Sequence, residues 1–131
     1  MFKGTLGQVG DFKVIGMDTI SDLVEEDAGN VIVCASHGGV SSGSYACKYP
    51  MRAVFFNDAG VGKDNAGIAA LAMLEEKGVP GLTYSHNSAR IGDVEDSWEN
   101  GVVSHLNYAA KKAGCQQGVS VQKSLETLAQ G

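Results

Sequence analysis

The sequence has few cysteines, and none of them is spaced as a redox or metal-binding pair. Cys34, Cys47 and Cys115 form no C-x-x-C motif, and their odd number does not suit a disulfide framework. Long apolar runs are also missing: the longest, 66–74, is far too short to span a bilayer, and residues 1–10 lack a signal-peptide pattern. We therefore expect a soluble, cytoplasmic protein with no membrane partner.

Positive charge is also scarce. The chain has 10 Lys and Arg against 15 Asp and Glu, which gives a formal net charge of −5. Nucleic-acid binding draws much of its affinity from clustered Lys and Arg that displace counterions. We therefore expect no nucleic-acid partner.

Glycine, by contrast, is abundant. It makes up 18 of the 131 residues, well above the roughly 7% of average proteins. No tract repeats glycine as a flexible linker does, so the excess belongs in turns and close backbone approaches. With 44% hydrophobic residues, the chain suits a single domain over residues 1–131.

Three short apolar runs predict the fold class. Residues 31–35, 52–56 and 80–84 are each followed by a polar, Gly-rich segment and then a helical pattern. Continuous apolar runs are typical of parallel strands covered on both faces, and the alternation of strand and helix indicates βαβ units. The sequence predicts a Rossmann-like α/β three-layer sandwich with a small, mostly parallel sheet of about four strands, residues 12–17 adding an edge strand.

Helices are expected between and after these strands. Segment 66–74 is apolar on nearly all sides, so we expect it to be covered by more than the sheet, as in a homo-oligomer. Asp93 is a good N-cap for the third helix, and Gly101 marks a possible break in it. The expected helices cover about 18–26, 42–49, 65–77, 93–112 and 119–130.

The polar segments that follow the three apolar runs, 36–44, 57–64 and 85–93, are the candidate functional site. In an open parallel sheet, ligands bind beyond the carboxyl ends of the strands. We expect the segments to share one hollow that binds a small polar or anionic molecule, such as a phosphorylated or carboxylated metabolite. The candidate ligand-binding residues are Ser36, Gly38, Gly39, Ser41, Ser42, Asn57, Lys63, Ser85, Ser88 and Arg90.

Three further residues in these segments suit acid–base catalysis. His37 and His86 can exchange protons near neutral pH, and Asp58, which follows an apolar strand, is expected to be desolvated with a raised pKa. Lys63 and Arg90 would hold the anion. Simpler explanations remain for each residue type, since serines cap helices, Asp side chains close turns and lysines lie on surfaces.

The motifs leave the reaction open. Gly39-Val-Ser41-Ser-Gly43 matches the G-x-S-x-G pattern of serine hydrolases, which suggests an alternative triad of Ser41, Asp58 or Asp93, and His86 or His105. Gly39 comes four positions after Ala35, however, whereas the turn that carries such a nucleophile directly follows its strand. His105, in an expected helix, is more simply a structural or surface residue. Lyase, isomerase and hydrolase chemistry remain open, as does a non-catalytic regulatory or assembly subunit.

Segment 57–64 fails two nucleotide-binding patterns. Asn57 stands where a P-loop needs its first Gly, Asp64 stands where it needs Ser or Thr, and Asn65 breaks G-x-G-x-x-G. No cofactor is therefore predicted. His37 and His86 could hold a metal together with Asp58 or Asp93, but their spacing matches no compact metal motif, so no metal site is predicted either.

Overall fold

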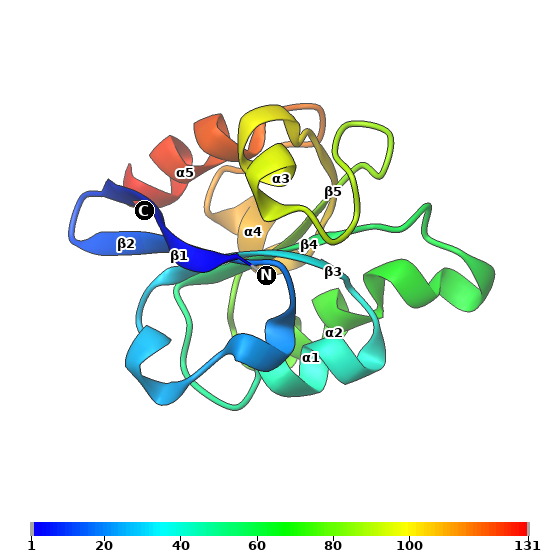
Figure 1. The fold of residues 1–131 in the computed structure, drawn as a ribbon, viewed down its shortest axis with the longest axis horizontal. Coiled ribbons are helices and arrows are strands. Elements are labelled where there is room, and N and C mark those ends of the chain that lie inside the picture. Colours follow the sequence, from blue (N-terminus) through cyan, green and yellow to red (C-terminus); the bar gives the residue numbers. More distant parts are fainter. Residues whose placement is uncertain (1, 131) are drawn as a thin grey trace.

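A computed structural model describes residues 2–130, apart from the side chain of Asp64; Met1 and Gly131, the ends of the expected domain, lie outside it. The described chain forms a six-stranded sheet between two layers of helices (Figure 1). Its strands are β1 (Lys3–Val9), β2 (Phe12–Met17), β3 (Val31–His37), β4 (Ala53–Asn57), β5 (Gly81–Tyr84) and β6 (Val103–Leu106). Its α-helices are α1 (Val40–Ala46), α2 (Ala69–Glu76), α3 (Val94–Asn100), α4 (Tyr108–Lys112) and α5 (Val121–Gln130), and its 3₁₀ helices are η1 (Ile20–Asp22), η2 (Glu25–Asp27) and η3 (Lys63–Ile68).

The strands lie in the sheet in the order in which they occur in the chain. β2, β3, β4 and β5 are parallel, whereas β1 and β6 pair antiparallel at the two edges. We expected a sheet of about four mostly parallel strands, so the predicted number of strands is wrong. The four central strands of the observed sheet do match that description. A Rossmann sheet has a point where the strand order reverses and a crevice opens. This sheet has no such reversal, so the prediction is confirmed only at the level of an α/β fold.

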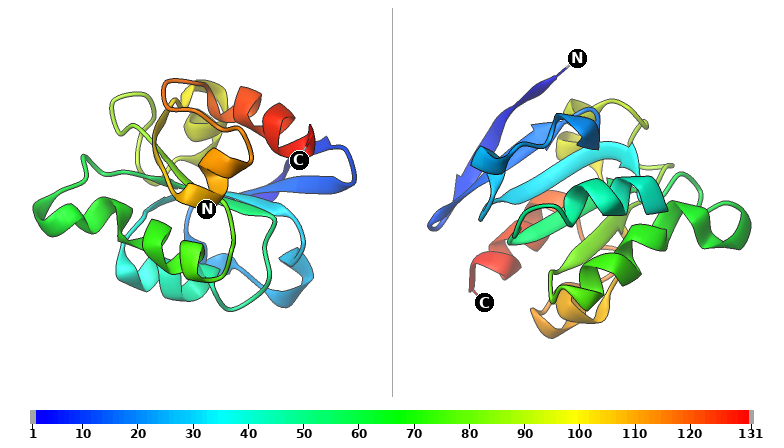
Figure 2. Two further views of the ribbon diagram at one scale, coloured as in Figure 1. Left: turned by 180° about the vertical axis from the view of Figure 1, so that it is seen from behind. Right: turned by 90° about the horizontal axis from the view of Figure 1, so that it is seen from below.

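Both faces of the central strands are buried, as their continuous apolar runs predict. In β3, Val31 and Val33 pack into one core layer, while Ile32 and Cys34 pack into the other. Helices α3, α4 and α5 cover the first face and α1, α2 and η1 cover the second (Figures 1 and 2). The connections between β2, β3, β4 and β5 all cross the same face of the sheet. Each joins a parallel strand to the next one on the same side, and right-handed crossovers of this kind all lie on one face.

The first strand was missed because its sequence is polar and contains two glycines. β1 pairs with β2 through a two-residue turn in which Gly10 has a φ of 59°, a conformation that glycine adopts easily. Gly16 leaves room for the Leu6 side chain, since a Cβ there would lie 2.5 Å from Leu6 Cδ1 and the leucine would have to move. Segment 12–17 is therefore a strand, as expected, but it is not at the edge of the sheet.

The long helix expected over 93–112 is wrong. Asp93 does cap α3, accepting a hydrogen bond from the Asp96 N–H at 3.1 Å, but that helix ends at Gly101. The chain then forms β6 against β5, so His105 lies in a strand and not in a helix. Asn107 caps the next helix, α4. A four-residue strand with only one neighbour carries too little periodicity to be told from helix in the sequence.

Three of the other four expected helices are confirmed with shorter or shifted bounds. α1 begins at Val40 and ends before Pro50, and α5 fills most of 119–130. The helix expected over 65–77 divides into η3 and α2, in which Leu71 and Leu74 are buried but Ala72 is exposed. The helix expected over 18–26 is replaced by η1 and η2. Within residues 2–130, no helix has both the length and the apolar character needed to cross a membrane.

Candidate functional site

The three polar segments follow the carboxyl ends of β3, β4 and β5, which lie together at one end of the parallel strands. We call this end the carboxyl edge of the sheet. His37 lies opposite Asn57 in the strand register, and Asn57 lies opposite Tyr84. Adjacent strands are about 4.8 Å apart, so the three exits span about 10 Å. Figure 1 shows the segments after β3, β4 and β5 together on the right-hand side of the molecule. The strand ends are therefore within reach of one small molecule.

Asn57 ties two of these segments together. Its side chain is fully buried; Nδ2 donates to the Ala89 carbonyl at 3.1 Å, and Oδ1 accepts from the Ala59 N–H at 2.8 Å. Both ends of the amide are therefore engaged by the protein. Asn57 positions the segments that follow β4 and β5.

Asp58 and His86 form the central pair of the site. Asp58, only 4% exposed, accepts hydrogen bonds at Oδ1 from the N–H groups of Gly60 (2.8 Å) and His86 (3.1 Å). The same oxygen lies 3.2 Å from His86 Nδ1. The His86 side chain is about half exposed, and its Nε2 has no partner in the described part of the chain. The pair therefore offers an oriented imidazole to solvent.

The expectation of a raised pKa for Asp58 is wrong in direction. Burial does oppose ionisation of this carboxyl group. The Ser104 hydroxyl, the backbone N–H groups of Gly60 and His86, and the His86 ring outweigh it, and together they lower the pKa below its usual value. The Asp58 carboxylate is therefore a stable anion that can orient His86. It is not suited to act as a proton donor itself.

Ser104 was not among the predicted site residues. It lies in β6, next to the strand that leads to His86, and its hydroxyl is 3.0 Å from that of Thr83. Nothing in the sequence singles it out, because its place beside Asp58 depends on the pairing of β6 with β5.

A strained turn holds Asp58 in place. Ala59 and Val61 have φ values of 51° and 68°, which are unusual for residues other than glycine and most unusual for a β-branched one. The Val61 N–H donates to the Asp58 carbonyl at 2.7 Å, and the Gly67 N–H donates to the Val61 carbonyl at 2.6 Å. Such strain persists only where the surroundings enforce it, and it concentrates at functional sites.

The segment after β3 is covered by the chain itself. A Cβ at Gly38 would lie 2.7 Å from the Gly67 carbonyl oxygen, and one at Gly39 would lie 2.7 Å from His37 Nε2. The Ser36 hydroxyl accepts a hydrogen bond from the Ile20 N–H at 3.2 Å. These small residues therefore make room for neighbouring protein groups, while the His37 side chain remains exposed.

In the segment after β5, the serines also close turns. Ser88 Oγ donates to the Ser85 carbonyl at 2.7 Å and accepts from the Val102 N–H at 3.0 Å. Arg90 is exposed, and its backbone N–H donates to Asp96 at 2.7 Å. Lys63, in the segment after β4, is exposed as well. Arg90 and Lys63 are thus the cations of these segments that solvent can reach.

The alternative serine triad is not assembled by hydrogen bonds within residues 2–130. Ser41 is exposed in the first turn of α1 and Ser42, beside it, is buried. No hydrogen bond links Ser41 to His86 or to Asp93, whose carboxylate caps α3. A serine hydrolase therefore stays a prediction on its motif alone.

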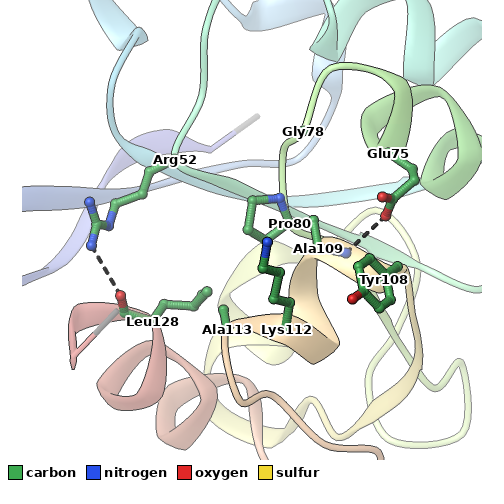
Figure 3. A pocket seen from close by; sticks show the side chains of 9 residues that line it. All are labelled: Arg52, Glu75, Gly78, Pro80, Tyr108, Ala109, Lys112, Ala113 and Leu128. Atoms are coloured by element: carbon green, nitrogen blue, oxygen red, sulfur yellow. Dashed lines mark hydrogen bonds between the residues drawn. The ribbon is translucent and has the colours of Figure 1, made fainter.

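A hollow of about 530 Å³ lies at the opposite ends of the parallel strands, and neither Asp58 nor His86 lines it (Figure 3). Over the described residues, no three His, Cys, Asp or Glu side chains gather closely enough to hold a metal. The site is thus defined by its hydrogen-bonded pair, and not by its shape.

Comparison with known proteins adds no relative. No protein-family model, curated protein or solved structure matches the chain. The function must therefore be argued from the α/β fold and the chemistry of its carboxyl edge.

Proposed function

We propose that the protein binds a small anionic metabolite at the carboxyl edge of its sheet and that His86 transfers protons to or from it. The observation that carries this proposal is the contact of Asp58 Oδ1 with His86 Nδ1. An ionised carboxylate can only accept, so it favours the imidazole form with a proton on Nδ1 and a lone pair on Nε2. An imidazole oriented in this way is a common general base.

The basic residues of the three polar segments suit an anion. Arg90 and Lys63 are exposed, and His37 lies on the neighbouring strand end. Guanidinium and ammonium groups bind carboxylates and phosphates through charge-assisted hydrogen bonds. Lyase, isomerase and hydrolase reactions of such substrates all require a proton transfer, which is the step that His86 would supply.

Thermal unfolding in the presence of candidate anions tests this proposal. A ligand present at 100 times its Kd should stabilise the native state by about 2.7 kcal/mol and raise Tm accordingly. Phosphate, sulfate and a panel of small organic phosphates and carboxylates are to be compared. Arg90→Gln should reduce the shift and His86→Ala should abolish turnover of any ligand that is consumed, while Lys13→Gln, a distant exposed cation, should change neither.

Indifference of Tm to every anion would contradict the proposal. So would a shift that survives unchanged in Arg90→Gln, Lys63→Gln and His86→Ala together, because the anion would then be bound elsewhere.

A second candidate, a non-catalytic assembly subunit, is favoured by exposed apolar side chains at the same edge. Val40 is 64% exposed and Ile91 is 51% exposed. The Gly92 N–H donates to the Ala35 carbonyl at 2.9 Å, which places Ile91 beside the end of β3. Isolated apolar residues are common on surfaces, but two near one strand end suit a contact with another copy of the chain.

Light scattering separates the candidates. If this edge forms an interface, the wild-type protein is oligomeric and Ile91→Lys shifts it toward the monomer, because a charge would be buried at the contact. Val24→Lys, which changes an exposed valine away from this edge, should leave the mass unchanged. A monomeric wild-type protein would rule out the assembly function at this edge.

A further inference from the structure

A hollow lies at the amino ends of the parallel strands, opposite the Asp58–His86 pair. It has a volume of about 530 Å³, within the range of about 300–1,000 Å³ that is typical of small-molecule sites. It opens between the starts of β4 and β5, the helix α4 and the carboxyl end of α5 (Figure 3). Its lining residues are Arg52, Glu75, Gly78, Pro80, Tyr108, Ala109, Lys112, Ala113 and Leu128.

Arg52 is held in a fixed position at one end of this hollow. Its Nη2 donates to the Leu128 carbonyl at 3.0 Å, and its guanidinium group lies over the Phe12 ring, 4.5 Å from the ring centroid. A guanidinium group has five N–H donors, and this is the one hydrogen bond that its side chain makes within residues 2–130. Arg52 is therefore pre-organised and still able to bind an anion.

The charge of the lining favours an anion as well. Lys112 projects into the same hollow (Figure 3), and no described carboxylate lies within ion-pair distance of Lys112 or Arg52. Glu75 is the acidic residue of the lining, and its Oε1 already accepts the Ala109 N–H at 2.8 Å. Figure 3 shows Glu75 and Arg52 at opposite ends of the hollow. Two cations thus face one engaged carboxylate, in a chain with a net charge of −5.

The remaining walls are apolar or aromatic. Pro80, Ala109 and Ala113 offer small apolar surfaces, and Tyr108, 66% exposed, offers an aromatic ring beside them. Aromatic rings pack well against flat apolar groups, and Arg and Lys recognise carboxylates. From this arrangement we infer that the hollow is a second binding site, which takes a small aromatic carboxylate with its acid group toward Arg52 and Lys112 and its ring along Pro80 and Tyr108.

Amide NMR titration of the whole chain tests this site, with benzoate as the probe and benzamide as its neutral counterpart. Benzoate should shift the amide signals of Gly78, Ala109 and Ala113, and these shifts should persist in Arg90→Gln, which alters only the site at the carboxyl ends of the strands. Benzamide should bind more weakly, because it lacks the charge that Arg52 and Lys112 recognise.

Substitutions test whether Arg52 and Lys112 bind the carboxylate group of benzoate. Lys112→Gln, on an exposed side chain, should weaken benzoate binding about two- to fivefold, as expected for one solvent-exposed ion pair. The double variant Arg52→Gln/Lys112→Gln should weaken it more than about tenfold, and Lys13→Gln should have no effect. Absence of shifts at millimolar benzoate, equal binding of benzamide, or unchanged affinity in a folded Lys112→Gln variant would overturn the proposal.

Discussion

Replacement of Asn107 by alanine should lower the free energy of unfolding by about 3–5 kcal/mol. The side chain is buried and makes four hydrogen bonds. Oδ1 accepts from the N–H groups of Gly81 and Ala110, both at 3.0 Å, and Nδ2 donates to the carbonyls of Leu71 (3.2 Å) and Val79 (3.0 Å). Alanine would remove one hydrogen-bond partner from each of these four backbone groups where water has little access. Urea denaturation followed by circular dichroism measures the loss.

Two further variants show whether the amide itself is responsible. Asn107→Asp keeps the acceptor but loses both donated bonds and sets a carboxylate against two carbonyls, so it should be about as destabilising as alanine. Asn100→Ala, at an exposed site with one bond to Asp96, should cost less than about 1 kcal/mol. A loss below about 1 kcal/mol for Asn107→Ala would mean that these hydrogen bonds do not hold α2, α4 and β5 together.

Replacement of Asp58 by alanine should have the second largest effect, a loss of about 2–4 kcal/mol at neutral pH. The buried carboxylate accepts from the Gly60 and His86 N–H groups and faces the His86 ring. Its removal leaves these donors without their acceptor and frees the strained turn that follows. Asp58→Asn keeps the shape and an acceptor oxygen, so it should cost less than alanine and separate the charge from the packing.

The contribution of Asp58 should also depend on pH in a defined direction. Its pKa is lower in the folded protein than the unperturbed value of about 3.9. The stabilisation is therefore fully present above the unfolded-state pKa and is lost as the pH falls through the folded-state pKa. The stability difference between wild type and Asp58→Asn should shrink from about pH 5 downward, as urea denaturation over a pH series can show.

A matched control is available for this pH series. Asp11 is exposed in the turn between β1 and β2, and Asp11→Asn should leave the acid dependence close to that of wild type. If wild type and Asp58→Asn lose stability in parallel as the pH falls, the hydrogen bonds to Asp58 do not favour its ionised form, and the argument for an oriented His86 loses its support.

The sequence alone determined the α/β class, the three central parallel strands and the closing helix. Runs such as 31–35 and 52–56 are apolar at every position, and this pattern arises from burial on two faces, whatever the strand order. Val121, Leu125 and Leu128 repeat at helical spacing and are buried in α5. The polar segments after these strands were found for the same reason, since the strand ends mark where burial stops.

The tertiary structure decided the features that depend on long-range neighbours. β1 and β6 are edge strands with one partner each, so their own sequences carry a weak pattern, and the long helix predicted over 93–112 was the consequence. The pKa of Asp58 is lowered by donors from Gly60, His86 and Ser104, which the chain brings together only on folding. The hollow between Arg52 and Lys112 likewise joins residues that precede β4 and β5 with residues of α2, α4 and α5. The order of apolar and polar residues along a segment indicates how deeply that segment is buried. The hydrogen-bond partners of a polar group, by contrast, are set by the packing of segments that are distant in the sequence.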